Sequence, residues 1–312
     1  MKKTAFLFPG QGSQFVGMGQ DFYEEFSFVK DIFDMTDEVT HLNISRLCFK
    51  GPMEELTQTV NLQPAVTAVN LAVLAALEKE GIQPDLTAGH SLGEYAALYA
   101  SEVLDRGNTV RAVMRRGELM HREAIKQQGA MVALIGISLK AVEDLINAVR
   151  SEGVVSIANH NAENQIVITG SPEPVRKVAG LASEQKAKAV TLNVSGAWHS
   201  DLMKGAEAEF AEFLSAMAFK DAKTPVVQNV TGDVATGADT IRDHMVKQLC
   251  SPVRWYDSVC RLMDLKTEVF VEIGPGKVLS NLVKKILPKG YPGKTYSVSD
   301  LRGYELLLNE IA

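Results

Sequence analysis

The middle of the chain carries a series of strand and helix signals that few folds accommodate. Between residues 129 and 194, short apolar runs alternate with segments of helical spacing in the order strand, helix, strand, strand, helix, strand. We assign these elements to residues 131–136, 139–150, 154–158, 165–169, 173–183 and 189–194. This βαββαβ order is typical of a ferredoxin-like unit. We therefore expect residues 128–197 to form a small ferredoxin-like domain.

The sequence on both sides of this unit alternates strand and helix signals. On the N-terminal side the expected elements are a strand at 4–8, a helix at 64–80, a strand at 86–88 and a helix at 94–103. On the C-terminal side they are a helix at 204–217, a strand at 225–229, helices near 239–249 and 255–263, and a strand at 269–272. Such alternation favours a mostly parallel sheet covered by helices. We therefore expect one large α/β domain, built from residues 1–127 and 198–312, into which the small domain is inserted.

The composition excludes several classes of protein. Of the 312 residues, 46% are hydrophobic and 22% are charged, which is the balance of a soluble globular chain and not of a disordered, collagenous or coiled-coil one. The net charge of −6 argues against nonspecific nucleic-acid binding, which usually needs a basic face. No run approaches the roughly 18 uninterrupted apolar residues of a membrane span. We therefore expect a soluble protein with no nucleic-acid or membrane partner.

The three cysteines, Cys48, Cys250 and Cys260, bear on the cellular compartment. Their number is odd and none belongs to a CxxC pair, so they suit neither a disulfide framework nor a zinc site. The apolar run near the N-terminus stops after four residues at Pro9, which is too short for an export signal. We therefore expect a cytoplasmic protein.

Residues 89–93, Gly-His-Ser-Leu-Gly, match the pattern G-x-S-x-G between an expected strand and an expected helix. Small residues flank the serine in this pattern because a sharp strand-to-helix turn leaves no room for side chains on either side. Such a turn exposes the hydroxyl of Ser91 at a helix N-terminus, where it can act as a nucleophile. The alternative is a serine that only caps the helix.

A serine nucleophile needs a base, and the chain has six histidines. His90 adjoins the serine, but neighbouring side chains on a sharp turn point apart. His199 follows the last strand of the small domain, where a loop that returns to the main sheet can deliver it to the serine. We therefore prefer His199 as the base. Because no acidic residue stands out as a third triad member, a backbone carbonyl or an amide side chain is the expected orienting group.

Two further segments are candidates for the site. The glycine-rich turn at 9–14 exposes backbone N–H groups, so Gln11 and the amide of Leu92 are candidate oxyanion donors, with a plain tight turn as the alternative. Arg115 and Arg116 lie at the end of an expected helix that starts near residue 105, which by itself suggests a solvated basic helix end. No nucleotide-binding or metal motif is complete, so we expect no cofactor and no metal.

Several motifs occur in an order that resembles one family. They are Phe-Pro-Gly-Gln-Gly-Ser-Gln at 8–14, Gly-His-Ser-Leu-Gly-Glu at 89–94, Arg-Gly at 116–117, His-Ser at 199–200 and Gln-Leu-Cys-Ser-Pro-Val at 248–253. Together they resemble the malonyl-CoA:acyl carrier protein transacylases, a bacterial acyltransferase family, over essentially the whole chain. The resemblance implies an α/β-hydrolase-like large domain, with a mostly parallel sheet and a ferredoxin-like insert, which agrees with the elements counted above.

The resemblance also implies how the reaction proceeds. Ser91 would be the nucleophile that becomes malonylated, and His199 would be its base. The backbone carbonyl of Gln248 would orient His199 in place of an acid, which explains why no triad carboxylate was found. The implied reaction is a ping-pong transfer of malonyl from malonyl-CoA to the phosphopantetheine thiol of acyl carrier protein, without a cofactor.

The remaining roles that the resemblance implies concern the substrate. Gln11 and Leu92 would supply the oxyanion donors, and Arg116 would bind the free carboxylate of the malonyl group. Trp198 departs from the phenylalanine that is commoner in malonyl-selective relatives. An aromatic residue there, and Leu92 in place of a glutamine, favour malonyl over the branched methylmalonyl group.

Three alternatives stay open at this point. The malonyl group feeds either fatty-acid synthesis or a polyketide assembly line served in trans, because the chemistry is the same. A serine acyl hydrolase or thioesterase uses the same nucleophile turn, and a noncatalytic carrier-protein docking module belongs to another class. We expect a monomer. We also expect an acidic carrier protein to bind at the densest basic cluster, which consists of Lys284, Lys285 and Lys289. The alternative is that these lysines are only a solvated helix end.

Overall fold

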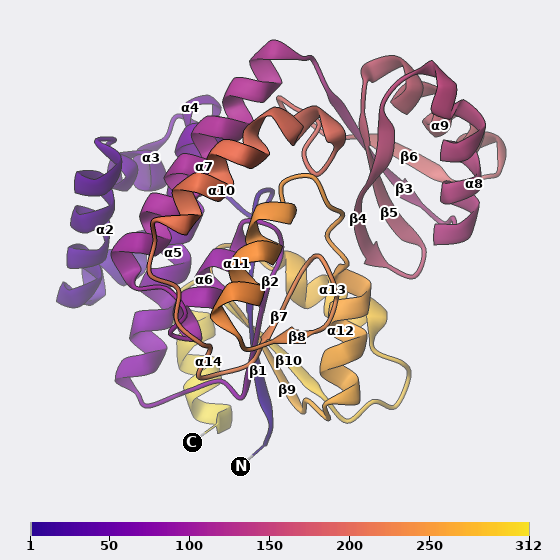
Figure 1. The fold of residues 1–312 in the computed structure, drawn as a ribbon. Helices are drawn as coiled ribbons and strands as arrows, with labels where there is room; N and C mark the ends of the chain where they lie inside the picture. The colour runs from indigo at the N-terminus through magenta and orange to yellow at the C-terminus, as the bar shows by residue number, and fades with distance from the viewer. Residues whose placement is uncertain (1, 312) are drawn as a thin grey trace.

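The computed structural model describes residues 2–311 and, within them, contains two sheets (Figure 1). The strands of the larger sheet lie in the order β10, β9, β1, β2, β7, β8. They are β1 (Thr4–Phe8), β2 (Leu86–Gly89), β7 (Val226–Val227), β8 (Val234–Ala235), β9 (Val269–Ile273) and β10 (Lys294–Val298). Neighbouring strands pair in parallel except β7 and β8. The expected mostly parallel sheet is therefore confirmed.

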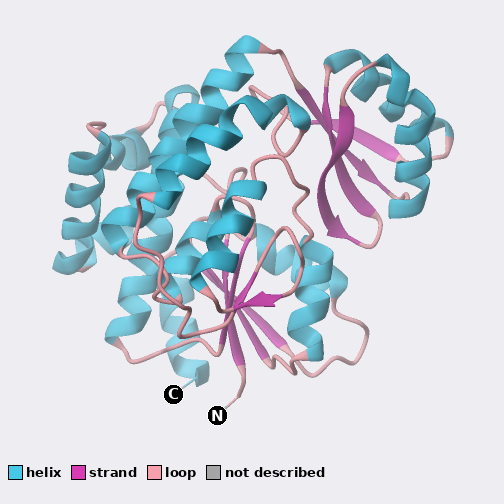
Figure 2. Ribbon diagram, viewed as in Figure 1, coloured by secondary structure: helices cyan, strands magenta, loops and turns pink. Residues whose placement is uncertain are grey.

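Helices cover both faces of this sheet (Figure 2). The alternation of β1 explains why: Phe6 and Phe8 pack into the cluster on one face, and Ala5 and Leu7 pack into the cluster on the other. The helices before the second sheet are α1 (Gln20–Glu25), α2 (Ser27–Thr40), α3 (Ile44–Lys50), α4 (Met53–Thr57), α5 (Thr59–Lys79), α6 (Gly93–Ala100) and α7 (Arg106–Lys126). Those after it are α10 (Glu207–Ser215), α11 (Ala238–Lys247), α12 (Trp255–Asp264), α13 (Val278–Ile286) and α14 (Leu301–Ile311), with a 3-10 helix, η2, at Asp201–Ala206.

The second sheet is antiparallel and comes from the middle of the chain. Its strand order is β4, β5, β3, β6, and its neighbouring strands pair antiparallel. Its elements are β3 (Ala130–Ile135), α8 (Leu139–Val149), the 3-10 helix η1 (Arg150–Glu152), β4 (Val155–Ala162), β5 (Gln165–Gly170), α9 (Pro172–Glu184) and β6 (Lys188–Thr191). The expected βαββαβ order is present. The division into domains at 127/128 and 197/198 stays a prediction.

Several predicted boundaries were wrong by a few residues. The strand expected at 154–158 continues to Ala162, because its last residues still pair with β5, with Ala162 opposite Gln165. Val253 from the larger part of the chain also bonds to it: Val253 donates to the carbonyl of Ala158, and the amide of His160 donates to the carbonyl of Val253. The helix expected at 94–103 ends at Ala100, and the helix expected from residue 204 opens as the 3-10 turn η2. The strand expected at 225–229 is reduced to β7, so that Asn229 lies in a loop.

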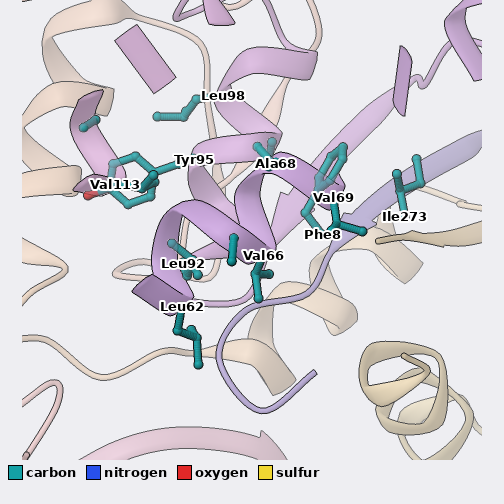
Figure 3. Packing of buried hydrophobic residues seen from close by; sticks show 14 of the residues in the cluster. Phe8, Leu62, Val66, Ala68, Val69, Leu92, Tyr95, Leu98, Val113 and Ile273 are labelled. Carbon is teal, nitrogen blue, oxygen red and sulfur yellow. The ribbon is translucent and has the colours of Figure 1, made fainter. Parts of the chain in front are cut away.

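Helix α5 forms the centre of the larger core. Leu62, Val66 and Val69 pack against α6 and β1 (Figure 3). Among the described residues, α5 is the one helix whose length and apolar composition would allow a membrane span, with a mean hydropathy of 1.6, but 89% of that window is buried inside the protein. The apolar character of α5 is thus used for core packing.

Candidate active site

Ser91 lies on a sharp turn between β2 and α6. Its φ of 51° is in the left-handed region, which is unusual for a residue with a side chain. The two flanking glycines make this turn possible, because a Cβ on Gly89 would collide with the backbone of Gly93, and a Cβ on Gly93 would collide with the carbonyl of Phe8. The turn is therefore pressed against β1, and strained backbone of this kind is characteristic of functional sites.

Asn229 holds this turn from the opposite side. Its Nδ2 donates to the carbonyl of Gly89 over 2.6 Å, and its Oδ1 accepts from the amide of Ser91 over 2.6 Å. Asn229 is buried, so these hydrogen bonds act in a medium where unmet polar groups are costly. A single side chain thus fixes the backbone on both sides of His90.

His199 is the histidine that faces the serine. Its Nε2 lies 2.8 Å from Oγ of Ser91, and its Nδ1 lies 2.8 Å from the backbone oxygen of Gln248. A carbonyl oxygen only accepts, so Nδ1 carries the proton and the lone pair of Nε2 points at the serine hydroxyl. This geometry allows His199 to take a proton from Ser91.

The surroundings keep His199 neutral. Burial and the positive charge of Arg116 lower the pKa of His199 to about 3, although the hydrogen bond with Gln248 opposes this. The side chain is 4% exposed. The base is therefore in its proton-accepting form at neutral pH.

His90 points elsewhere. Its Nε2 lies 2.8 Å from Oδ1 of Asn161, and its ring lies beside that of Trp255 with 5.6 Å between centroids. Burial lowers the pKa of His90. No hydrogen bond between His90 and Ser91 is formed within residues 2–311, so His90 is not placed to serve as the base.

Arg116 lies in the middle of α7, which begins at Arg106 and continues to Lys126. The expectation that Arg115 and Arg116 end a helix was therefore wrong. The solvated reading fits Arg115, which is partly exposed and forms ion pairs, but not Arg116, whose side chain is 1% exposed. The helix continues because residues after 116 keep an apolar stripe against the core, including Leu119 and Met120.

The guanidinium of Arg116 points at the nucleophile. It donates to Oγ of Ser91 over 3.1 Å, to Oε1 of Gln248 over 3.0 Å and to Oε1 of Gln63 over 3.1 Å. All of these acceptors are neutral, and Nε has no partner among the described residues. Burial lowers the pKa of Arg116, while the nearby Tyr95 and Glu94 raise it. The result is a buried cation with unused donor capacity beside the serine.

The oxyanion candidates lie at the same place. Gln11 and Leu92 line one cavity of about 90 Å³ together with Ser91, Arg116 and His199. Within the described part of the chain, the backbone amides of Gln11 and Leu92 have no protein acceptor. The amide of Ser91 itself is occupied by Asn229, so it is not available to an oxyanion. All six sequence-predicted site residues therefore lie together. Five of them line this cavity, and the backbone oxygen of Gln248 contacts His199.

Residues of the antiparallel sheet and residues outside it both contribute to the wall of this cavity. Its remaining lining consists of His90, Met120, Met131, Asn159, Leu192, Val194 and Trp198. A volume of about 90 Å³ is far below the roughly 300–1,000 Å³ of sites for drug-sized ligands. The cavity therefore suits a short acyl group and not a long fatty chain. Trp198 contributes to this small size, because its ring lies in the wall and is almost fully buried.

Three residues of the site escaped the sequence analysis. Gln63 holds Arg116, Asn229 holds the serine turn, and Glu94 accepts hydrogen bonds from Asn229 and Gln248. Only Glu94 had a local signal, because it is an acidic residue directly before the apolar residues Tyr-Ala-Ala-Leu of the same helix. Among residues 2–311, no group of three His, Cys, Asp or Glu side chains is arranged to hold a metal ion.

Comparison with known proteins agrees with this arrangement. Residues 5–302 match the family of the acyl transferase domain. The chain is 45% identical to the malonyl CoA-acyl carrier protein transacylase of Bacillus subtilis over 313 aligned positions, which cover 100% of this chain and 98% of that protein. It is 38% identical to the enzyme of the same name from Staphylococcus aureus, with 97% of this chain and 99% of that protein covered.

Solved structures give the same result. An acyl carrier protein S-malonyltransferase from Vibrio cholerae has a TM-score of 0.93 at 37% identity, with 98% of this chain and 99% of that chain covered. A malonyl-transacylase in complex with a type II PKS acyl-carrier protein has a TM-score of 0.94 at 35% identity, with 99% of this chain and 99% of that chain covered.

Proposed function

The chain belongs to the acyl transferase domain family, and we propose that it transfers malonyl from malonyl-CoA to the phosphopantetheine thiol of acyl carrier protein for fatty-acid synthesis. The observation that carries this proposal is the guanidinium of Arg116. It is buried, it contacts Oγ of Ser91, and its hydrogen bonds go to neutral acceptors only. A malonyl group on Ser91 would supply the missing carboxylate, as a planar partner for a planar donor.

The first half of the reaction follows from the geometry of Ser91 and His199. Nε2 of His199 removes the hydroxyl proton as Oγ attacks the thioester carbonyl. The amides of Gln11 and Leu92 are placed to donate to the oxyanion that forms. The C–S bond then breaks, the thiolate of coenzyme A takes the proton from His199, and malonyl-Ser91 remains.

The second half reverses these steps with a different thiol. His199 removes the proton from the phosphopantetheine thiol of the carrier protein, and the thiolate attacks the malonyl-serine ester. The ester C–O bond breaks, and Oγ of Ser91 regains its proton from His199. The nucleophile, base and donors are all groups of the chain, so the reaction needs no cofactor. We place it in the cytoplasm, where the thiols of Cys48, Cys250 and Cys260 stay reduced.

The test is acylation of Ser91 itself. Incubation with malonyl-CoA should add one malonyl mass to the peptide that contains Ser91, and adding holo acyl carrier protein should remove it. Ser91→Ala should abolish the label. Labelling of another residue in Ser91→Ala at the wild-type rate would refute the assignment, and release of free malonate without transfer would favour the acyl hydrolase.

A further inference from the structure

Glu94 is a buried carboxylate that directly follows the serine turn and has no part in the steps above. It lies in the first turn of α6 and is 1% exposed. An ionised carboxylate in a core position is costly unless donors surround it. The groups that contact Glu94 therefore indicate how a carboxylate is stabilised in this position.

The first contact is with the side chain of Gln248. Arg116 has only donors, so the amide oxygen of Gln248 must face the guanidinium, which turns its nitrogen toward Glu94. The same nitrogen donates to the carbonyl of Ser91 over 3.0 Å. Oε2 of Glu94 thus fixes the amide that orients Arg116, and this amide belongs to the residue whose backbone oxygen orients His199.

The second contact is with Asn229. Oε1 of Glu94 accepts from the backbone amide of Asn229 over 2.9 Å. The side chain of Asn229 holds the backbone of Gly89 and Ser91. Both oxygens of Glu94 therefore face donors, and the ionised carboxylate accepts at each without a proton of its own to accommodate.

We propose that Glu94 is a positioning residue for acyl transfer, which acts through Gln248 and Asn229 to hold His199 and Arg116 against Ser91. The proposal rests on the proposed function for its substrate. Glu94 touches neither the nucleophile side chain nor the base. Its effect is on the geometry of three groups that come from distant parts of the chain.

Burial of Glu94 disfavours its charged form, and the groups around it favour that form. The pKa of Glu94 is raised to about 7 as the net result of two effects. Burial raises it, and the hydrogen bonds from Asn229 and Gln248 and the charge of Arg116 lower it in part. A carboxylate that only capped α6 would not need donors from two other segments. The arrangement links the serine turn to the loops at 229 and 248 through one side chain.

The test is Glu94→Gln, with Glu272→Gln as the matched control. A glutamine at position 94 must turn its NH₂ group toward one of the two donors. One of the two hydrogen bonds is therefore lost, while the size and shape of the side chain stay nearly the same. Glu272 is also fully buried, and its oxygens accept from the amides of Leu279 and Ser280 over 2.9 and 2.7 Å, away from Ser91. The same substitution there creates the same conflict outside the site.

We expect Glu94→Gln to lower kcat for acylation of Ser91 by malonyl-CoA by about 10- to 100-fold, because a buried hydrogen bond to a charged group is lost. The preference for malonyl-CoA over acetyl-CoA should also fall, because Arg116 loses its fixed amide. Glu272→Gln should leave both quantities unchanged. Glu94→Asp keeps the charge but is one methylene shorter, so it should recover part of the rate.

A fluorophosphonate probe separates this proposal from the proposed function. It reports the nucleophilicity of Ser91 whatever the natural acyl donor is. If wild type reacts with the probe but not with malonyl-CoA, the proposed function fails, and slower labelling of Glu94→Gln than of Glu272→Gln still supports the positioning role. Equal rates for wild type and Glu94→Gln, or equal losses in Glu94→Gln and Glu272→Gln, would overturn it.

Discussion

Nη2 of Arg116 lies 3.1 Å from Oγ of Ser91. The cation therefore acts on the site in two ways. It is placed to stabilise negative charge that would develop on the serine oxygen, and its charge adds to burial in lowering the pKa of His199. It also faces the cavity in which an acyl group would lie, so the same guanidinium can recognise a substrate carboxylate.

Arg116→Ala should therefore change which acyl group is transferred. Loss of one partner of a charge-assisted pair costs about 1.5–3 kcal/mol, so kcat/KM for malonyl-CoA should fall about 10- to 150-fold. Acetyl-CoA has no carboxylate and should lose far less or gain. Arg116→Lys should recover only part of the malonyl rate, because an ammonium cannot form two parallel hydrogen bonds. An equal fall for both donors would assign Arg116 to Ser91 and His199, to the fold or to the coenzyme A moiety, and not to the malonyl carboxylate.

His199→Ala should lower the acylation rate by about 10² to 10⁴ and leave the fold intact, because the proton acceptor of Ser91 is removed. The matched variant is His90→Ala, whose ring adjoins the site but bonds to Asn161. Rapid-quench measurement of malonyl-enzyme formation compares them. A severe loss in His90→Ala together with a mild one in His199→Ala would reverse the assignment.

The pH dependence should distinguish Glu94 from His199. With the pKa of His199 near 3, the base stays neutral throughout the range of pH 5 to 8. The pKa of Glu94 is about 7, in surroundings that include Arg116, Tyr95, Asn229 and Gln248, and its protonation places a hydrogen on a carboxylate whose oxygens already face donors. Wild-type kcat/KM should thus fall as the pH decreases through about 7, and Glu94→Gln should lack this limb. A limb that persists in Glu94→Gln would assign the titration to another group.

Charge reversal on α13 should weaken the carrier-protein step alone. Lys284 and Lys285 are exposed, and Nζ of Lys285 lies 3.2 Å from Oε1 of Gln165 on β5, so this end of α13 lies beside the antiparallel sheet. Carrier proteins are generally acidic, so Lys284→Glu with Lys285→Glu should raise KM for carrier protein and leave KM for malonyl-CoA unchanged. An unchanged KM for carrier protein would exclude these lysines from the interface.

Gly93→Ala should be strongly destabilising. The new Cβ would overlap the backbone of Phe8 and Pro9, which cannot move without disturbing β1, so we expect a loss of about 3 kcal/mol or more. Gly180→Ala is the control, because it lies within α9 with open space around it and should stabilise by about 0.5–1 kcal/mol. Chemical denaturation of both variants measures the difference. A Gly93→Ala variant as stable as wild type would refute the tight packing of the turn.

Local patterns were sufficient to predict most of the fold. The apolar run of β1, the small residues around Ser91 and the βαββαβ order each depend on neighbours in sequence, and each is present in the structure. Boundaries failed where a distant segment decides them. The strand expected at 225–229 is reduced to Val226–Val227, because on β2, far away in the chain, only Thr87 and Ala88 pair with it.

The same physical reason limited the prediction of the site. Asn229 and Gln63 carry no local signal, because their partners Ser91 and Arg116 are 138 and 53 residues away in sequence. The burial of Arg116 also depends on other helices, so its place in α7 could not be read from residues near it. The family resemblance suggested its role, and the structure adds the contacts through which it would act.

The cavity wall is built from separate segments of the chain, which affects how the acyl-group specificity of such a protein can change in evolution. Ser91 and Arg116 come from the turn before α6 and from α7, whereas Met131, Leu192 and Val194 come from β3 and the segment after β6. Substitutions in this second group resize the space for the acyl group without displacing Ser91 or Arg116. The size of the acyl group that fits and the placement of Ser91 and Arg116 can therefore change independently, through mutations in separate stretches of one gene.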